Sequence, residues 1–135
     1  MNNLAVDGIT YVLFPEEQIK KYVIDICEKE WDADDFPKYG NDLYQSTWKL
    51  EEIEIAKIFP NPTLMQSEFF QKDVQPRLQK QKELHLAKAP IFPLILRGKD
   101  LLIFDGYARY LLLKELEVKK CLAYVGHLQN RLIQG

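Results

Sequence analysis

The residues that could do chemistry in this sequence are concentrated in one short segment, Asp105-Gly106-Tyr107-Ala108-Arg109. A glycine lets the backbone approach a ligand closely, and the free amides in the first turn of a helix attract an anion. Arg109 would sit in that turn, where its planar guanidinium could contact two phosphate oxygens. In an enzyme, Asp105 is the best candidate for a base or a magnesium contact, and Arg109 for stabilising charge on a transferring phosphoryl group.

A simpler interpretation gives the same residues structural roles. Asp105 would cap the helix, Gly106 would form the turn, and Arg109 would cover the edge of the core with its aliphatic stem. The two interpretations differ in what Arg109→Ala should do. An anion site predicts weaker ligand binding with the fold largely intact, whereas a structural role predicts lost stability.

The surrounding pattern is expected to place this segment between a strand and a helix. Two apolar runs, 94–96 and 101–104, flank Arg97-Gly98-Lys99-Asp100, which predicts a β-hairpin with Arg97 as a second candidate cation. After the second run, apolar residues recur at helical spacing. They are Ala108, Leu112 and Leu116, with Leu111 beside them.

Composition favours a globular domain and gives no overall case for nucleic acid. The chain has 135 residues, 47% of them hydrophobic, and a formal net charge of −2. The segment 72–99 is locally basic, so DNA binding is expected to be weak and confined to it. No run has the roughly eighteen apolar residues of a membrane span, so no membrane partner is expected. Cys27 and Cys121 fit no metal-ligand spacing, which favours buried thiols in a reducing cytoplasm and no metal site.

The first 47 residues are predicted to form an extension that packs on the core domain. Residues 9–14 read as a strand, and a helix is expected to start at Pro15. One face of that helix is apolar and must pack on the core or on a partner protein. Residues 32–37 read as an acidic loop and residues 40–47 as a connector. The apolar face consists of Ile19, Tyr22, Val23, Ile26 and Cys27.

The core domain is expected to span residues 48–135. Its first strand shows Ile53 and Ile55 alternating with glutamates, and Pro60-Asn61-Pro62 ends it in a turn. Ser67 can start a helix, which Pro76 is expected to kink or divide. The apolar stripe of this helix consists of Phe70, Val74 and Leu78.

The order of these elements resembles the ParB/sulfiredoxin-like superfamily from Trp48 to Leu128. Strand, hairpin, Asp-Gly-x-x-Arg-Tyr, apolar helix and terminal strand follow in the family's sequence. The resemblance implies an α/β (α+β) fold, with a small mixed sheet and flanking helices. It also implies that the Gly-x-x-Arg turn binds the phosphates of ATP, ADP or CTP, with Mg²⁺ if the protein is catalytic. The implied site consists of Asp105, Gly106, Tyr107 and Arg109, with Arg97 as the second cation.

The chain departs from the catalytic branches of that family. ParB proteins carry Gly-Glu-Arg-Arg, whereas Tyr107 and Ala108 fill the middle positions here. Sulfiredoxins place a cysteine after the glycine, where Tyr107 offers no thiolate. The branch that resembles free-serine kinases has Asp-Gly-His-His-Arg at this turn. This chain keeps the aspartate, the glycine and the arginine but lacks both histidines. Family members with nucleotide activity carry a Gly-x-x-Gln-Pro element before the hairpin. Its three fixed positions correspond to Ala89, Phe92 and Pro93 in this chain, so only the proline is kept.

The sequence therefore predicts a nucleotide- or phosphate-binding ParB-like domain, with nucleotide hydrolysis or phosphoryl transfer as an extension of that role. Two alternatives remain open. One is a non-catalytic protein-interaction module that uses the N-terminal helix. The other is a weak, non-specific DNA-binding or nuclease-type protein, although nuclease chemistry usually needs clustered acids and Asp105 alone cannot hold the metal.

Overall fold

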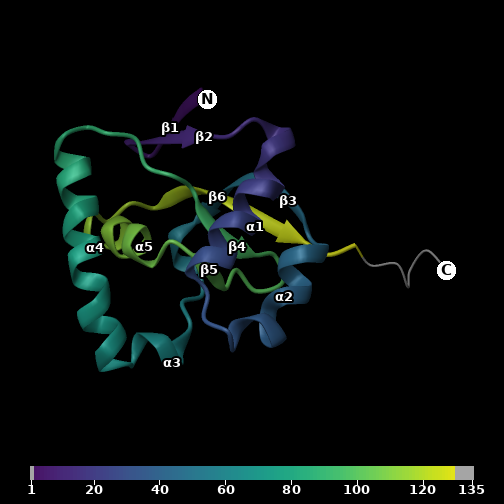
Figure 1. Cartoon of the computed structure of the whole chain (residues 1–135). Coiled ribbons are helices and arrows are strands. Elements are labelled where there is room, and N and C mark those ends of the chain that lie inside the picture. The colour runs from purple at the N-terminus through teal and green to yellow at the C-terminus, as the bar shows by residue number, and fades with distance from the viewer. Residues whose placement is uncertain (1, 130–135) are drawn as a thin grey trace.

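The computed structural model describes residues 2–129, and residues 130–135 of the predicted core domain lie outside that range. Within it, four strands form one mixed sheet in the order β3-β6-β4-β5 (Figure 1). They are β3 (Thr47–Glu54), β6 (Lys120–His127), β4 (Leu94–Arg97) and β5 (Ile103–Asp105). β6 pairs antiparallel with β3 and parallel with β4, and β4 pairs antiparallel with β5. The predicted small mixed sheet and its hairpin are confirmed.

Helices cover both faces of this sheet, because strand residues alternate between two apolar clusters. On one face, Ile95 and Tyr124 pack against α1 (Ile19–Glu30) and α2 (Asp35–Gln45). On the other face, Leu94 and Leu96 pack against α5 (Tyr107–Glu115). α4 (Glu68–Leu86) packs on α5 (Figure 1). The start of α5 therefore lies between the sheet and α4.

The N-terminal segment begins with a hairpin whose first strand was not predicted. β2 (Ile9–Leu13) confirms the expected strand, and β1 (Asn2–Val6) pairs with it. The turn contains Asp7 at φ 52° and Gly8 at φ 84°. Asp-Gly is the preferred dipeptide for such a two-residue turn, so the signal was present in the sequence.

The predicted N-terminal helix is present and its apolar face is buried. A short 3₁₀ turn, η1 (Glu16–Gln18), leads into α1. Ile19, Val23 and Cys27 are buried, and they pack toward β5 and β6. Of the two predicted possibilities, the core or a partner protein, the apolar face of α1 packs mainly on this chain's own sheet.

Residues 40–47 do not form the predicted connector, because α2 runs from Asp35 to Gln45. The acidic loop is correspondingly shorter than expected. Pro37, Gly40 and Asn41 give this segment poor helix propensity, which explains the wrong prediction. Burial of Gly40 and Leu43 stabilises the helix instead.

The turn after β3 and the helix after it largely match the prediction. Ile55 is not in the strand, because η2 (Ile55–Lys57) follows it. Asn61 caps α3 (Pro62–Met65) by accepting from the amides of Thr63 and Leu64, and Ser67 caps α4 by accepting from Phe70. α4 continues through Pro76, so the predicted division of this helix does not occur.

Candidate functional site

The predicted joint between strand and helix is present. β5 ends at Asp105, Gly106 is the N-cap residue, and α5 starts at Tyr107. Gly106 has φ 111°, a conformation that side chains disfavour. A Cβ atom there would lie 2.7 Å from Leu94 Cδ2 and 2.9 Å from Arg109 Nη2. Glycine is therefore required both by the backbone conformation and by the packing around it.

Asp105 does not cap α5 as the sequence suggested, since no side chain bonds the first amides of that helix. Its carboxylate instead accepts a hydrogen bond from Arg109 Nη2 at 2.7 Å. Burial raises the pKa of Asp105 above its ordinary value, and the Arg109 guanidinium acts in the opposite direction. The pair is thus a buried ion pair within the candidate site.

Arg109 is held by partners within the chain. It is only 9% exposed, and Nη1 donates to the carbonyl oxygens of Phe92 and Pro93, both at 3.1 Å. Together with Asp105 these contacts tie α5 to β5 and to the segment that enters β4. An incoming phosphate would have to compete with all three acceptors for this guanidinium. No local pattern in the sequence indicates the two carbonyl partners.

Arg97, the second predicted cation, is also paired. Nε and Nη2 donate to the two oxygens of Asp100 at 3.0 and 2.7 Å, and Nη1 donates to Asp42 at 3.3 Å. Its guanidinium lies 5.5 Å from the centre of the Tyr39 ring. The pair with Arg97 lowers the pKa of Asp100. Arg97 therefore ties the hairpin turn to α2 and does not line the cleft beside Gly106.

Tyr107, a predicted site residue, also connects two elements of the fold. Its hydroxyl oxygen accepts a hydrogen bond from the amide of Asn61 at 3.0 Å, and its ring packs edge-on against Phe70. Burial raises the pKa of Tyr107 to about 12, so the phenol is neutral near pH 7. α5 is thereby fixed to the turn before α3.

A cleft of about 510 Å³ opens beside the start of α5. Asp105, Gly106 and Tyr107 line it, so three predicted site residues come together there while Arg97 and Arg109 lie outside its lining. Aromatic side chains contribute much of its wall: Trp31, Tyr39, Phe69, Phe70 and Phe104. Among residues 2–129, five carboxylates line it, from Glu30, Asp32, Asp35, Asp73 and Asp105.

The cleft has a negative balance of charge. Arg77 is the one basic side chain that the described residues contribute to its lining, and Arg77 Nη2 lies 3.1 Å from Asp73 Oδ2. Residues 32–37 were predicted to form an acidic loop, and nothing in their local sequence indicates that Asp32 and Asp35 line this cleft. Within 2–129, no group of three or more histidine, cysteine or acidic side chains is arranged to hold a metal ion.

Comparisons with known proteins found similarity only among solved structures. No family model and no curated protein matches the chain. A structure titled "Structure of the pNOB8-like ParB N-domain" shares 23% identity with a TM-score of 0.46, over 65% of this chain and 30% of that one. The C2221 form of a Pnob8-like ParB-N domain shares 22% identity with a TM-score of 0.40, over 66% of this chain and 33% of that one.

This chain resembles ParB N-domains. The matched region spans about a third of each of these ParB chains. None of the helices in residues 2–129 has the length and apolarity to cross a bilayer.

Proposed function

We propose that this domain is a non-catalytic interaction module that binds a positively charged segment of a partner protein in the cleft beside α5. The observation that supports this proposal is the charge of the cleft. The lining carries five carboxylates and one arginine within the described chain. Asp73 is paired with Arg77 and Asp105 with Arg109, so the remaining negative charge comes from Glu30, Asp32 and Asp35. Such a cleft attracts cations and repels free phosphate.

The aromatic wall suits the same class of ligand. Trp31 packs edge-on against Phe104, with ring centres 5.0 Å apart, and its indole nitrogen donates to the Phe104 carbonyl at 2.9 Å. The ring is thereby held in place before a ligand arrives. A lysine or arginine side chain gains from contact with an aromatic face as well as from nearby carboxylates. Glu30 is the last residue of α1, and Trp31 follows it. In this proposal the end of the N-terminal helix therefore takes part in partner binding.

A peptide titration tests this proposal. We expect an arginine-rich peptide to bind and a glutamate-rich peptide of equal length not to bind, and we expect added salt to weaken binding. Glu30→Gln combined with Asp32→Asn should weaken binding by about three- to tenfold, because two carboxylates facing the ligand lose their charge. Isothermal titration calorimetry measures both effects.

The matched control removes two carboxylates elsewhere. Glu16 and Glu17 line a different hollow, so Glu16→Gln with Glu17→Gln makes the same change in net charge outside the cleft. This control should bind the peptide as the unchanged protein does. Equal losses in the two double variants would mean that overall charge, rather than the cleft, attracts the peptide.

The second candidate ligand is the nucleotide that the sequence resemblance implies. Its support is the start of α5, where Gly106 lines the same cleft. The first hydrogen bond of the helix runs from the Tyr110 amide to Gly106 O at 2.8 Å, so the amides before Tyr110 are available to an anion. The ligand would have to arrive as a magnesium complex to offset the carboxylates. In a catalytic form of this proposal, Asp105 is the candidate base, since burial raises its pKa.

One thermal-shift experiment separates the two candidates. ATP, ADP and CTP are tested with and without Mg²⁺, next to the arginine-rich peptide, because a ligand of the native state raises the melting temperature. We expect the peptide to raise it and the nucleotides to leave it unchanged. A shift with a magnesium nucleotide alone would favour the nucleotide site.

DNA binding has weaker support than either. The basic segment lies largely on α4, where Arg77 is 3.1 Å from Asp73 and Lys82 Nζ is 3.0 Å from Glu115. These pairs reduce the charge available to phosphates. We expect little binding to unrelated duplexes at physiological salt, with a steep loss as salt rises wherever binding is detected.

A further inference from the structure

β3 is an edge strand of the four-stranded sheet. It has eight residues and ends the sheet order β3-β6-β4-β5. Within residues 2–129 it pairs with β6 on its inner side, and no strand of this range pairs with its outer edge. An exposed edge of this length is a template for strand addition.

The register with β6 identifies which backbone groups face outward. The Ile55 amide donates to Lys119 O at 2.9 Å, and hydrogen-bonded positions alternate along an antiparallel ladder. Odd-numbered residues of β3 therefore bond β6. On β6, the Gly126 carbonyl opposite Trp48 accepts from Gly98 on the β4 side, which agrees with this alternation. The residues whose amides and carbonyls face the free edge are Trp48, Leu50, Glu52 and Glu54.

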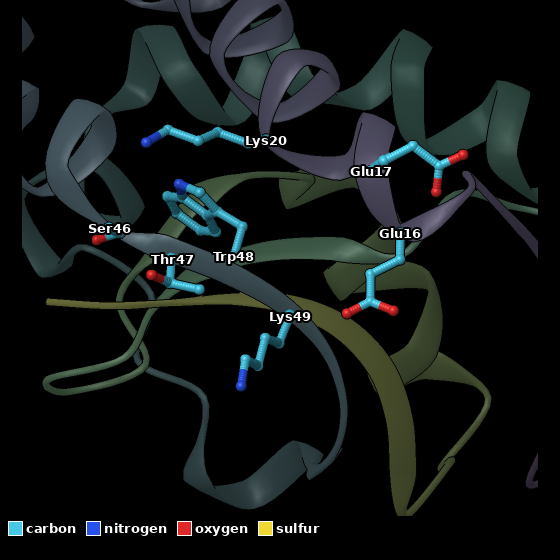
Figure 2. A pocket seen from close by; sticks show the side chains of 7 residues that line it. All are labelled: Glu16, Glu17, Lys20, Ser46, Thr47, Trp48 and Lys49. Carbon is cyan, nitrogen blue, oxygen red and sulfur yellow. The ribbon is translucent and has the colours of Figure 1, made fainter. Parts of the chain in front are cut away.

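Space is available along the first half of this edge. A hollow of about 490 Å³ lies between residues 46–49 and the start of the N-terminal helix, where Glu16, Glu17 and Lys20 line it. Figure 2 shows the Trp48 ring on one side of β3 and the Lys49 side chain on the other, as expected for a strand. A second strand can approach β3 here without displacing a helix from the sheet face.

We infer that this edge pairs with the same edge of a second copy of the chain, antiparallel and centred on Leu50. In this register Leu50 faces Leu50, and the outward groups of Trp48 face those of Glu52. Lys49 then stands directly opposite Glu51, and the two-fold symmetry forms this pair twice. The two four-stranded sheets become one continuous sheet.

The charges along β3 select this register. Shifting the centre by one residue puts Lys49 opposite Lys49 in one direction and Glu51 opposite Glu51 in the other, and like charges directly opposite are destabilising. Charged residues on an edge deter unrelated strands. Here their order also makes the edge complementary to itself. In the isolated chain Glu51 lies against His127 of β6, so forming the pair with Lys49 requires Glu51 to turn from this inner partner toward the outer edge.

Reciprocal charge reversal tests the inference. The unchanged protein is expected to show a concentration-dependent dimer in sedimentation equilibrium. Lys49→Glu and Glu51→Lys, each alone, should weaken the dimer by about tenfold or more, because two attractive pairs become repulsive. The double variant restores opposite charges and should recover the dimer. A monomer at every concentration, or equal losses in the single and double variants, would overturn the inference.

A proline pair tests the backbone contact separately. Glu52→Pro removes an outward amide that would bond the second copy, and its effect on the β6 ladder is small because that amide faces away from β6. Glu54→Pro removes an outward amide beyond the paired residues 47–53 and serves as the control. We expect only Glu52→Pro to abolish the dimer, with circular dichroism confirming that both variants fold. A dimer that survives Glu52→Pro would place the interface elsewhere.

Discussion

Truncating Arg109 to alanine is expected to lower the free energy of unfolding by about 3–5 kcal/mol, the usual cost of removing one partner of a buried ion pair. The change leaves the Asp105 carboxylate buried without its cation and frees the Phe92 and Pro93 carbonyls. Arg109→Lys should lose less, because lysine keeps the charge but cannot reach three acceptors in a planar arrangement. Chemical denaturation with urea measures both variants.

Arg77→Ala is the control for that prediction. Arg77 forms an ion pair with Asp73, which lies four residues earlier, and the two charged groups are 3.1 Å apart. Both side chains are half exposed, unlike those of Arg109 and Asp105. Such pairs contribute about 0–1 kcal/mol, so the stability should change little. If Arg109→Ala proves as mild as Arg77→Ala and weakens nucleotide binding, Arg109 is a ligand contact as first predicted, and its internal partners are dispensable.

Gly106→Ala is expected to lower the free energy of unfolding by about 2–4 kcal/mol. The left-handed backbone contributes about 1–2 kcal/mol of this cost, and the forced contacts with Leu94 and Arg109 contribute the remainder. Thermal and urea unfolding of the purified variant measure the loss. The expected effect is large because the Cβ atom would meet two side chains that are themselves buried.

Gly40→Ala provides the matched control. Gly40 lies within α2, and its added Cβ would meet only the Tyr44 ring, at 3.8 Å, which is an ordinary contact. Alanine favours a helix over glycine by about 0.5–1 kcal/mol, so this variant should be neutral or slightly stabilised. A loss at Gly40 equal to that at Gly106 would contradict the role assigned to the left-handed turn.

The sequence predicted the elements whose signals are local. The hairpin of β4 and β5, the start of α5 after Gly106 and the Ser67 cap all follow from turn chemistry and short-range spacing. α2 was missed because Pro37 and Gly40 oppose a helix locally, and the burial that stabilises it depends on the sheet.

The candidate site was harder to predict, because its character depends on residues distant in sequence. Spacing identified Arg109 as a cation in a first turn, but it could not show that the Phe92 and Pro93 carbonyls occupy its guanidinium. The carboxylates of the cleft come from residues as far apart in the sequence as Glu30 and Asp105. No local motif joins them, so the sign of the cleft's charge appears only once the fold is known.

Cation binding in the cleft beside α5 can be located residue by residue through the backbone amides. Amide shifts of ¹⁵N-labelled protein are recorded while an arginine-rich peptide, or magnesium with ATP or CTP, is added. We expect shifts with the peptide, confined to the segments that line the cleft, residues 30–35, 69–77 and 102–107, and none with the nucleotides. Shifts at Gly106 and Tyr107 with a magnesium nucleotide, and none with the peptide, would contradict this expectation.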